Sequence, residues 1–96
     1  MTKAEIVNEI ITQTGIEKEA VEAVVESIMV TIKKSMADGE NIYLRGFGTF
    51  LLKKRAAKTG RNITKNTPVK IPAHMIPAFK PSKEFTAQIK SRVKVN

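Results

Sequence analysis

The segment RAAKTGRNITKNTPVKIPA, residues 55–73, decides how the rest of this 96-residue chain must be organised. Five of its nineteen residues are Lys or Arg, none is Asp or Glu, and few are large and apolar. A segment of this composition cannot bury enough apolar surface to join a hydrophobic core. We therefore expect it to leave the folded body and to become ordered against a partner.

Charge is divided unevenly between the two parts of the chain. Residues 1–39 contain four Lys and seven acids, a balance of −3, whereas residues 40–96 contain thirteen Lys and Arg and two acids, a balance of +11. The whole chain has a net charge of +8. A cationic surface confined to one part of a protein is typical of polyanion binding. A basic surface that serves only solubility is the alternative.

The composition argues against several classes of protein. There is no Cys, so neither a disulfide framework nor a thiolate metal site can form. No apolar run approaches the roughly 20 residues that cross a bilayer, and the N-terminus lacks the apolar region of a signal peptide. We expect a soluble, cytoplasmic protein with no membrane partner, no small-molecule substrate, no metal and no cofactor.

The first part of the chain has the periodicity of a helical hairpin. Thr2 and Glu5 have the spacing of a capping box, in which the hydroxyl and the carboxylate each accept a backbone N–H. Apolar residues at helical spacing then predict a first helix at about 3–13, which ends at a left-handed Gly15.

The second helix is apolar over more of its length than one short hairpin can cover. Its stripe comprises Ala20, Val21, Val24, Val25, Ile28, Met29, Ile32 and Met36. Four aromatic rings also need a partner: Phe47, Phe50, Phe79 and Phe85. A small core without disulfides usually needs oligomerisation. We expect an obligate homodimer that shares this helix and the Phe cluster, with a marginal monomer as the alternative.

The apolar period changes from helical to alternating after the second helix. The stretch ENIYLRGFGTFLLKKR, residues 40–55, is rich in β-branched and aromatic residues. It predicts strands at about 41–45 and 48–55, joined by a turn at RGFG. HMIPAFK, residues 74–80, predicts a third strand, in which Pro77 limits backbone hydrogen bonding.

A last helix is expected over 82–93, with Ser82 as its N-cap. The predicted fold class is α+β in one domain over residues 1–96. Its parts are a helical hairpin (1–39), a three-stranded antiparallel sheet (40–55 and 74–80), an arm (56–73) and the C-terminal helix.

The arm itself has the pattern of a two-stranded ribbon. Turn-type residues occur at Thr59-Gly60 and Lys65-Asn66, and Val69 and Ile71 alternate with Lys70. Such a ribbon is marginal alone in water, but it fits a DNA groove. Its cations suit phosphate: Lys53, Lys54, Arg55, Lys58, Arg61, Lys65 and Lys70. A disordered basic loop without a defined target is the alternative.

Four motifs resemble one known family. They are GFGTF (46–50), KTGRN (58–62), IPA (71–73) and PAFKPSK (77–83). In order and in spacing they are similar to the HU / integration host factor (IHF) family of bacterial histone-like DNA-bending proteins. The resemblance covers about residues 1–90.

The resemblance implies an intertwined dimer with a β-saddle and two protruding arms that enter the minor groove. A residue at each arm tip would wedge between base pairs and kink the duplex. By position, Arg55, Lys58 and Arg61 are arm contacts, and Asn62 sits beside the wedge. Lys80 and Lys83 lie where flanking DNA would wrap, Gly46 and Gly48 permit a tight turn, and Phe47, Phe50 and Phe79 form the shared dimer core. Lys53, Lys65, Lys70 and His74 complete the predicted DNA contacts.

The chain departs from the family pattern at Ile63, where Pro usually follows GRN. Ile is apolar and can act as a wedge, although it is less rigid than Pro and has a backbone N–H. We expect Ile63 to intercalate, with Pro68 as a less suitable substitute. We expect His74 to contact a phosphate, and a surface His without that role is the alternative.

The predicted function is architectural binding of double-stranded DNA in the nucleoid, largely without sequence specificity. Bent, nicked or gapped DNA should bind better because part of the deformation cost is already met. A sequence-preferring IHF-like DNA bender and a general charge-driven binder of DNA or RNA are the alternatives. With one His and two acids in the basic part, we expect no catalytic residues and no enzyme activity.

Overall fold

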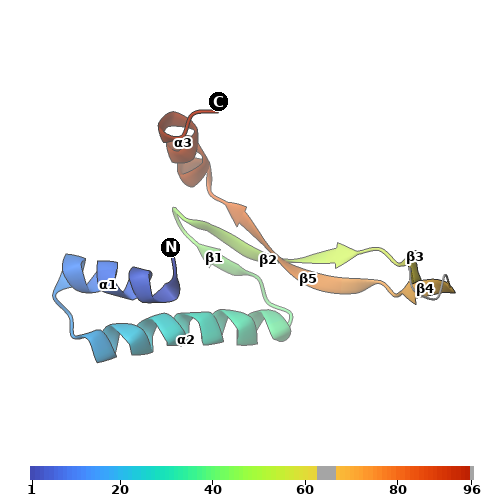
Figure 1. Ribbon diagram of the computed structural model, residues 1–96, viewed down its shortest axis with the longest axis horizontal. Coiled ribbons are helices and arrows are strands. Elements are labelled where there is room, and N and C mark those ends of the chain that lie inside the picture. The colour runs from blue at the N-terminus through green and yellow to red at the C-terminus, as the bar shows by residue number, and fades with distance from the viewer. Residues whose placement is uncertain (63–66, 96) are drawn as a thin grey trace.

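The computed structural model describes residues 1–62 and 67–95. The protein is elongated, with extents of 57 × 37 × 29 Å and a radius of gyration of 18.9 Å, whereas a compact chain of this length would have about 12.5 Å. Figure 1 shows that a long pair of strands carries a ribbon away from a small helical body. Within the described residues the elements follow the order ααβββββα, which confirms the α+β fold class.

Helix α1 spans Lys3–Thr14. The Thr2 hydroxyl caps it by accepting the Glu5 N–H at 3.3 Å. The Glu5 carboxylate accepts from that same hydroxyl at 3.2 Å, where the sequence predicted a backbone N–H as the donor. Gly15 adopts φ 72° and ends the helix through an N–H to the Ile11 carbonyl, as predicted.

Helix α2 spans Lys18–Ala37 and packs against α1. An ion pair of 2.9 Å joins Lys3 Nζ to Glu26 Oε2. The hydrogen bond and the charge attraction raise the pKa of Lys3 and lower the pKa of Glu26. Both side chains are exposed, so the pair adds little stability, and that little is lost in acid as Glu26 becomes protonated.

Three antiparallel strands form the main sheet in the order β1-β2-β5. They are β1 (Ile42–Leu44), β2 (Gly48–Arg55) and β5 (His74–Pro81), which confirms the three predicted strands. In the single chain β5 is an edge strand, which accommodates Pro77 opposite Leu52 because an edge residue need not donate on its outer side.

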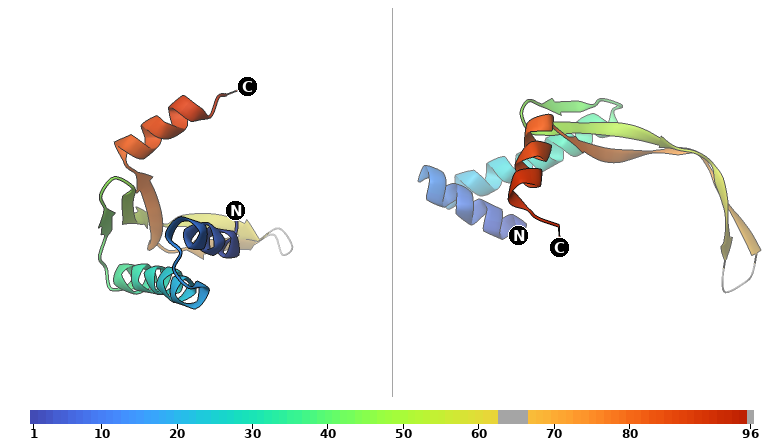
Figure 2. Two further views of the ribbon diagram at one scale, coloured as in Figure 1. Left: turned by 90° about the vertical axis from the view of Figure 1, so that its left-hand side faces the viewer. Right: turned by 90° about the horizontal axis from the view of Figure 1, so that it is seen from above.

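The arm is a second, two-stranded sheet of β3 (Lys58–Asn62) and β4 (Thr67–Ile71). Residues 56–57 and 72–73 interrupt both strands at the same level. Seen from above, the β3–β4 ribbon turns away from the line of β2 and β5 (Figure 2, right). The predicted ribbon is therefore present, and it is separated from the main sheet by a joint.

Gly46 and Gly48 serve different purposes. Gly46 has φ 81° in a turn closed by a 2.9 Å hydrogen bond from the Phe47 N–H to the Leu44 carbonyl. Gly48 is already part of β2, and a Cβ there would lie 2.6 Å from both the Phe79 ring and the Lys80 carbonyl. The prediction that Gly48 permits the turn is wrong, because its place is set by close packing against β5.

Four phenylalanines form one cluster beside Gly48. Ring centroids are 4.9 Å apart for Phe50 and Phe79, 5.2 Å for Phe47 and Phe79, and 5.4 Å for Phe47 and Phe85. These separations are those of favourable aromatic pairs. Phe47 and Phe79 nevertheless stay 46% and 38% exposed, so the cluster is incompletely covered by its own chain.

Helix α3 spans Lys83–Arg92 and is fastened to the β1–β2 turn by Ser82. The Ser82 hydroxyl accepts the Phe85 N–H at 3.1 Å and donates to the Gly46 carbonyl at 3.0 Å, which confirms Ser82 as the N-cap. Figure 1 shows that α3 stands away from the helical hairpin. Ile89 and Val93 remain exposed.

The chain leaves an unusual amount of surface uncovered. Its accessible area is 8487 Å², whereas a compact monomer of this mass would expose about 5,500 Å². Among the residues whose burial is described, Val7, Val21 and Met36 are the buried apolar side chains. None of the helices within residues 1–62 and 67–95 combines the length and apolar character needed to cross a membrane.

Gly48→Ala tests the close packing of β2 against β5. The new methyl group would meet the Phe79 ring and the Lys80 backbone, and we expect the free energy of unfolding to fall by about 1–3 kcal/mol. Thr49→Ala, on the other face of the same strand, is the control and should change it by less than about 1 kcal/mol. Equal losses in urea denaturation would contradict the packing argument.

Candidate nucleic-acid interface

The register of β2 against β5 sorts the side chains of the main sheet onto two faces. Alternate residues of a strand point to opposite faces, and directly opposite residues share one. The aromatic face consists of Gly48, Phe50, Leu52, Lys54, Met75, Pro77, Phe79 and Pro81. The cationic face consists of Thr49, Leu51, Lys53, Arg55, His74, Ile76, Ala78 and Lys80.

Four of the predicted DNA contacts lie together on the cationic face. They are Lys53, Arg55, His74 and Lys80, and all four are exposed. Lys54 is also exposed, but it lies on the aromatic face with Phe50 and Phe79. Sequence reasoning had grouped Lys54 with the other cations, and only the pairing register separates it from them.

The arm carries exposed cations on both of its faces. Lys58 is paired with Ile71, and Lys70 is paired with Thr59, so the two lysines occupy alternate register positions. A ribbon lying in a DNA groove has a phosphate backbone on each side, which this arrangement suits. Arg61 and Asn62 belong to β3 by their backbone. Ile63, Lys65 and Asn66 lie outside the described residues.

A cleft of about 660 Å³ lies at the root of the arm, where the two sheets meet. It is lined by Arg55, Ala56, Ala57, Lys58, Ile71, His74 and Ile76. The His74 ring is held there by a 2.9 Å hydrogen bond between its Nδ1 and the Pro72 carbonyl. Basic residues from β2, β3 and β5 therefore converge on one concave site.

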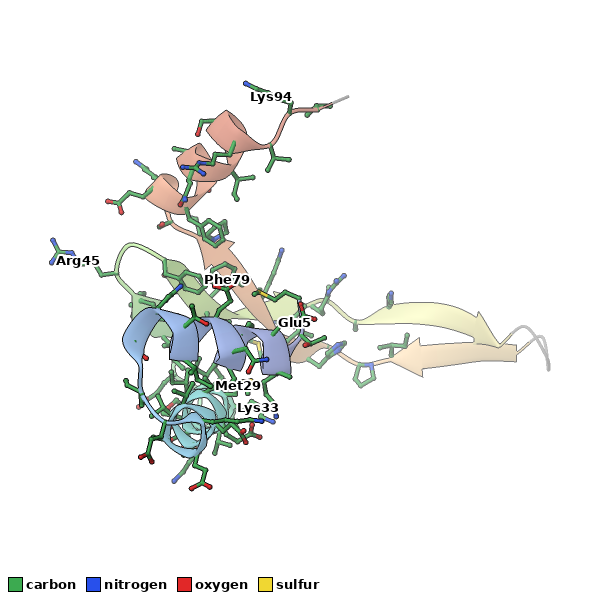
Figure 3. The ribbon with its side chains drawn as sticks, turned by 60° about the vertical axis from the view of Figure 1, so that its left-hand side comes forward. Glu5, Met29, Lys33, Arg45, Phe79 and Lys94 are labelled. Atoms are coloured by element: carbon green, nitrogen blue, oxygen red, sulfur yellow. The ribbon has the colours of Figure 1, made fainter. Side chains whose placement is uncertain are left out.

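A second basic notch, of about 410 Å³, lies at the opposite end of the cationic face. Lys80 and Lys83, both predicted contacts, line it together with Arg45, which sequence reasoning missed. Figure 3 shows Arg45 projecting outward from the β1–β2 turn. The signal was present, because Arg45 directly precedes the Gly46 that makes the turn. One acid borders the notch, since a Cβ on Gly46 would lie 3.5 Å from the Glu84 carboxylate.

The basic surface has no acid of its own to neutralise it along the strands. No Asp or Glu occurs between Glu40 and Glu84 in the sequence. The ion pairs that join described residues are both in the helical hairpin, from Lys3 to Glu26 and from Lys18 to Glu22. In the same residues, no group of three His, Asp or Glu side chains is placed to bind a metal ion.

Comparison with known proteins assigns the chain to a family. The family described as bacterial DNA-binding protein matches residues 1–90. The chain belongs to this family. Integration host factor subunit beta from Marinobacter nauticus is 44% identical over 95 residues, covering 98% of this chain and 97% of the relative. DNA-binding protein HU from Thermus thermophilus is 38% identical over 90 residues, covering 94% and 93%.

A solved structure agrees with this assignment. The Anabaena HU–DNA cocrystal structure superimposes with a TM-score of 0.89 at 32% identity, covering 94% of this chain and 98% of that one. The predicted membership of the HU/IHF family is therefore confirmed, as is the HU-like α+β fold. The protein is an architectural DNA-binding protein of bacterial type.

Lys53 and Lys54 provide a direct test of the cationic face, because they are adjacent, equally charged and on opposite faces. Lys53→Gln should weaken duplex binding and reduce the slope of log K against log salt by about 0.9 per protomer. Lys54→Gln should change that slope much less. Fluorescence anisotropy at several salt concentrations measures both slopes, and equal effects would show that the assigned face does not bind the duplex.

Proposed function

We propose that this protein binds double-stranded DNA as a homodimer and bends and compacts it, largely without sequence specificity. The observation that carries the proposal is the series of cations along one face, which only the Leu51–Ala78 pair interrupts. It runs from the Arg45 notch over Lys80, Lys53 and Arg55 to Lys58 at the start of the arm. A surface of this length follows a duplex backbone more readily than it fits a small ligand.

The arms supply the deformation in this mechanism. Each β3–β4 ribbon enters the minor groove, where Lys58, Lys70, Arg61 and Lys65 face phosphates and Asn62 lies beside the wedge. Ile63 is the proposed wedge because it follows GRN in the sequence. Unstacking a base step costs a few kcal/mol, which contacts with the wrapped flanking DNA offset. Those flanking contacts fall to Arg45, Lys80 and Lys83.

The surface that one chain leaves open supports the proposed homodimer. The excess of accessible area over a compact monomer is about 3,000 Å², well above the roughly 800 Å² that each partner buries in a standard interface. Ile28 on α2 is 52% exposed, and Ile89 on α3 is also uncovered. Phe47, Phe50 and Phe79 are the proposed shared core, because a second copy would complete the cover of their cluster.

Sequence preference enters this proposal through DNA deformability, because phosphate contacts carry no direct sequence information. A sequence-preferring, IHF-like role is the second candidate, and the 44% identity to an integration host factor subunit favours it. We also propose that the protein has no catalytic activity and that it is associated with the nucleoid in the cytoplasm. We propose that residues 1–96 form a single HU/IHF-like domain.

Ile28→Glu tests the proposed dimer. Glu would bury a charge in the shared face of α2, so we expect the protein to become monomeric or to unfold at concentrations where the wild type is dimeric. Val30→Glu is the matched control, because Val30 is 53% exposed and lies nearly opposite Ile28 on the helix. Sedimentation velocity that shows a monomeric wild type, or equal dissociation of both variants, would refute the shared face.

The test of DNA bending compares an intact duplex with the same duplex carrying a short gap, for the wild type and Ile63→Ala. We expect the wild type to prefer the gapped duplex about tenfold or more, because the gap removes part of the unstacking cost. Ile63→Ala should lose most of that preference while its salt slope stays unchanged. If both proteins bind both duplexes equally, DNA bending is refuted and the protein binds DNA by charge alone. Binding to an RNA duplex of equal length then measures how far affinity depends on duplex geometry.

A further inference from the structure

We propose that DNA binding by this protein is proton-linked through His74, which becomes a phosphate contact only in its charged imidazolium form. The inference rests on the proposed function and adds a regulation to it. It concerns the cleft at the arm root, where His74 lies with Arg55 and Lys58.

The geometry brings the three basic side chains to one place from three strands. His74, the first residue of β5, is directly opposite Arg55, the last residue of β2, and both belong to the cationic face. Lys58 begins β3 on the far side of the joint. All three line the same cleft and are exposed, so a DNA phosphate can reach them together.

The hydrogen bond to Pro72 fixes which nitrogen of His74 carries a proton. A carbonyl oxygen can only accept, so Nδ1, at 2.9 Å from the Pro72 oxygen, must be the N–H. In the neutral ring Nε2 then carries a lone pair and has no hydrogen. It cannot form a hydrogen bond to a phosphate oxygen, because both atoms are acceptors. Protonation turns Nε2 into a charged donor and leaves the Pro72 bond in place.

Cations lie around the His74 ring, both on its face of the sheet and in its cleft. Strand β2 contributes Lys53 and Arg55 to the same face, β3 contributes Lys58, and β4 contributes the apolar Ile71 to the cleft. No acid occurs between Glu40 and Glu84 in the sequence. Neither ion pair between described residues involves His74. A bound phosphate would therefore supply an anionic partner for the imidazolium.

The sign of the effect follows from this difference. The DNA complex favours the charged ring, so binding takes up protons and affinity rises as pH falls. Histidine is the side chain that proteins use as a charge switch in the physiological pH range, so we look for the change of affinity between pH 8 and pH 5.5. A hydrogen bond to a charged group in each of two protomers should make binding about tenfold or more tighter at the lower pH.

The experiment measures the affinity of the full-length protein for an intact duplex from pH 5.5 to 8 at constant ionic strength. His74→Gln removes the titration, and His74→Arg makes the charge permanent. We expect the wild type to change from the affinity of the Gln variant at pH 8 toward that of the Arg variant at pH 5.5, while both variants stay nearly flat. The salt slope of the wild type should steepen by about 0.9 per ring over the same range.

The controls are internal, because His74 is the only histidine of the chain. The N-terminal amine and the acids of the helical hairpin titrate equally in the Gln variant, so subtracting its profile removes their effects. The ring signals of His74 in NMR provide an independent readout, and their titration midpoint should move to higher pH when DNA is added.

The outcomes separate this inference from the proposed function. If DNA binds and the wild type and His74→Gln have the same pH profile, or if DNA leaves the ring titration unmoved, the proton linkage is wrong and the DNA-binding function stands. If none of the three proteins binds a duplex at any pH, the proposed function itself fails, and the linkage fails with it.

Discussion

The pairing of β2 with β5 is the interaction on which the rest of the structure depends. Eight directly opposed residue pairs, from Gly48 with Pro81 to Arg55 with His74, determine which side chains share a face. Because side chains alternate along a strand, a slip of one residue would move the cations to the side of the phenylalanines. Close contact of Gly48 with Phe79 and the Lys80 carbonyl leaves little room for any other register.

The two faces created by this pairing have opposite requirements, and one chain satisfies neither. In the phenylalanine cluster next to the aromatic face, Phe47 and Phe79 keep more than a third of their surface exposed although they contact each other and Phe85. On the cationic face, positive side chains accumulate without an acid between residues 41 and 83. A second copy of the chain would cover the first face, and a polyanion would neutralise the second. The small core and the high charge therefore have a common explanation in association.

The joint between the two sheets matters as much as the sheets. Both strands are interrupted at the same level, by Ala56-Ala57 on one side and Pro72-Ala73 on the other. The ribbon can change direction there because the side chains are small and Pro72 has no backbone N–H that needs a partner. The change of direction opens the cleft that brings His74 beside Arg55 and Lys58. Residues that the sequence assigns to the arm thus line a concave basic surface together with residues of the main sheet.

The sequence by itself was sufficient for the elements and for the type of partner. Periodicity and capping residues predicted the helices that begin near Thr2 and Ser82, and four motifs predicted the family, because these signals are local. The tertiary structure alone decided which residues lie together on one face or in one notch. It placed Lys54 and Lys53 on opposite faces of the sheet and Arg45 in a notch with Lys80 and Lys83. It also showed that Gly48 is needed for close packing against β5, whereas the sequence had assigned it to the turn. The reason is physical: a local pattern determines how one strand alternates, but only the pairing of strands that are distant in the chain determines which faces coincide and how closely their backbones approach.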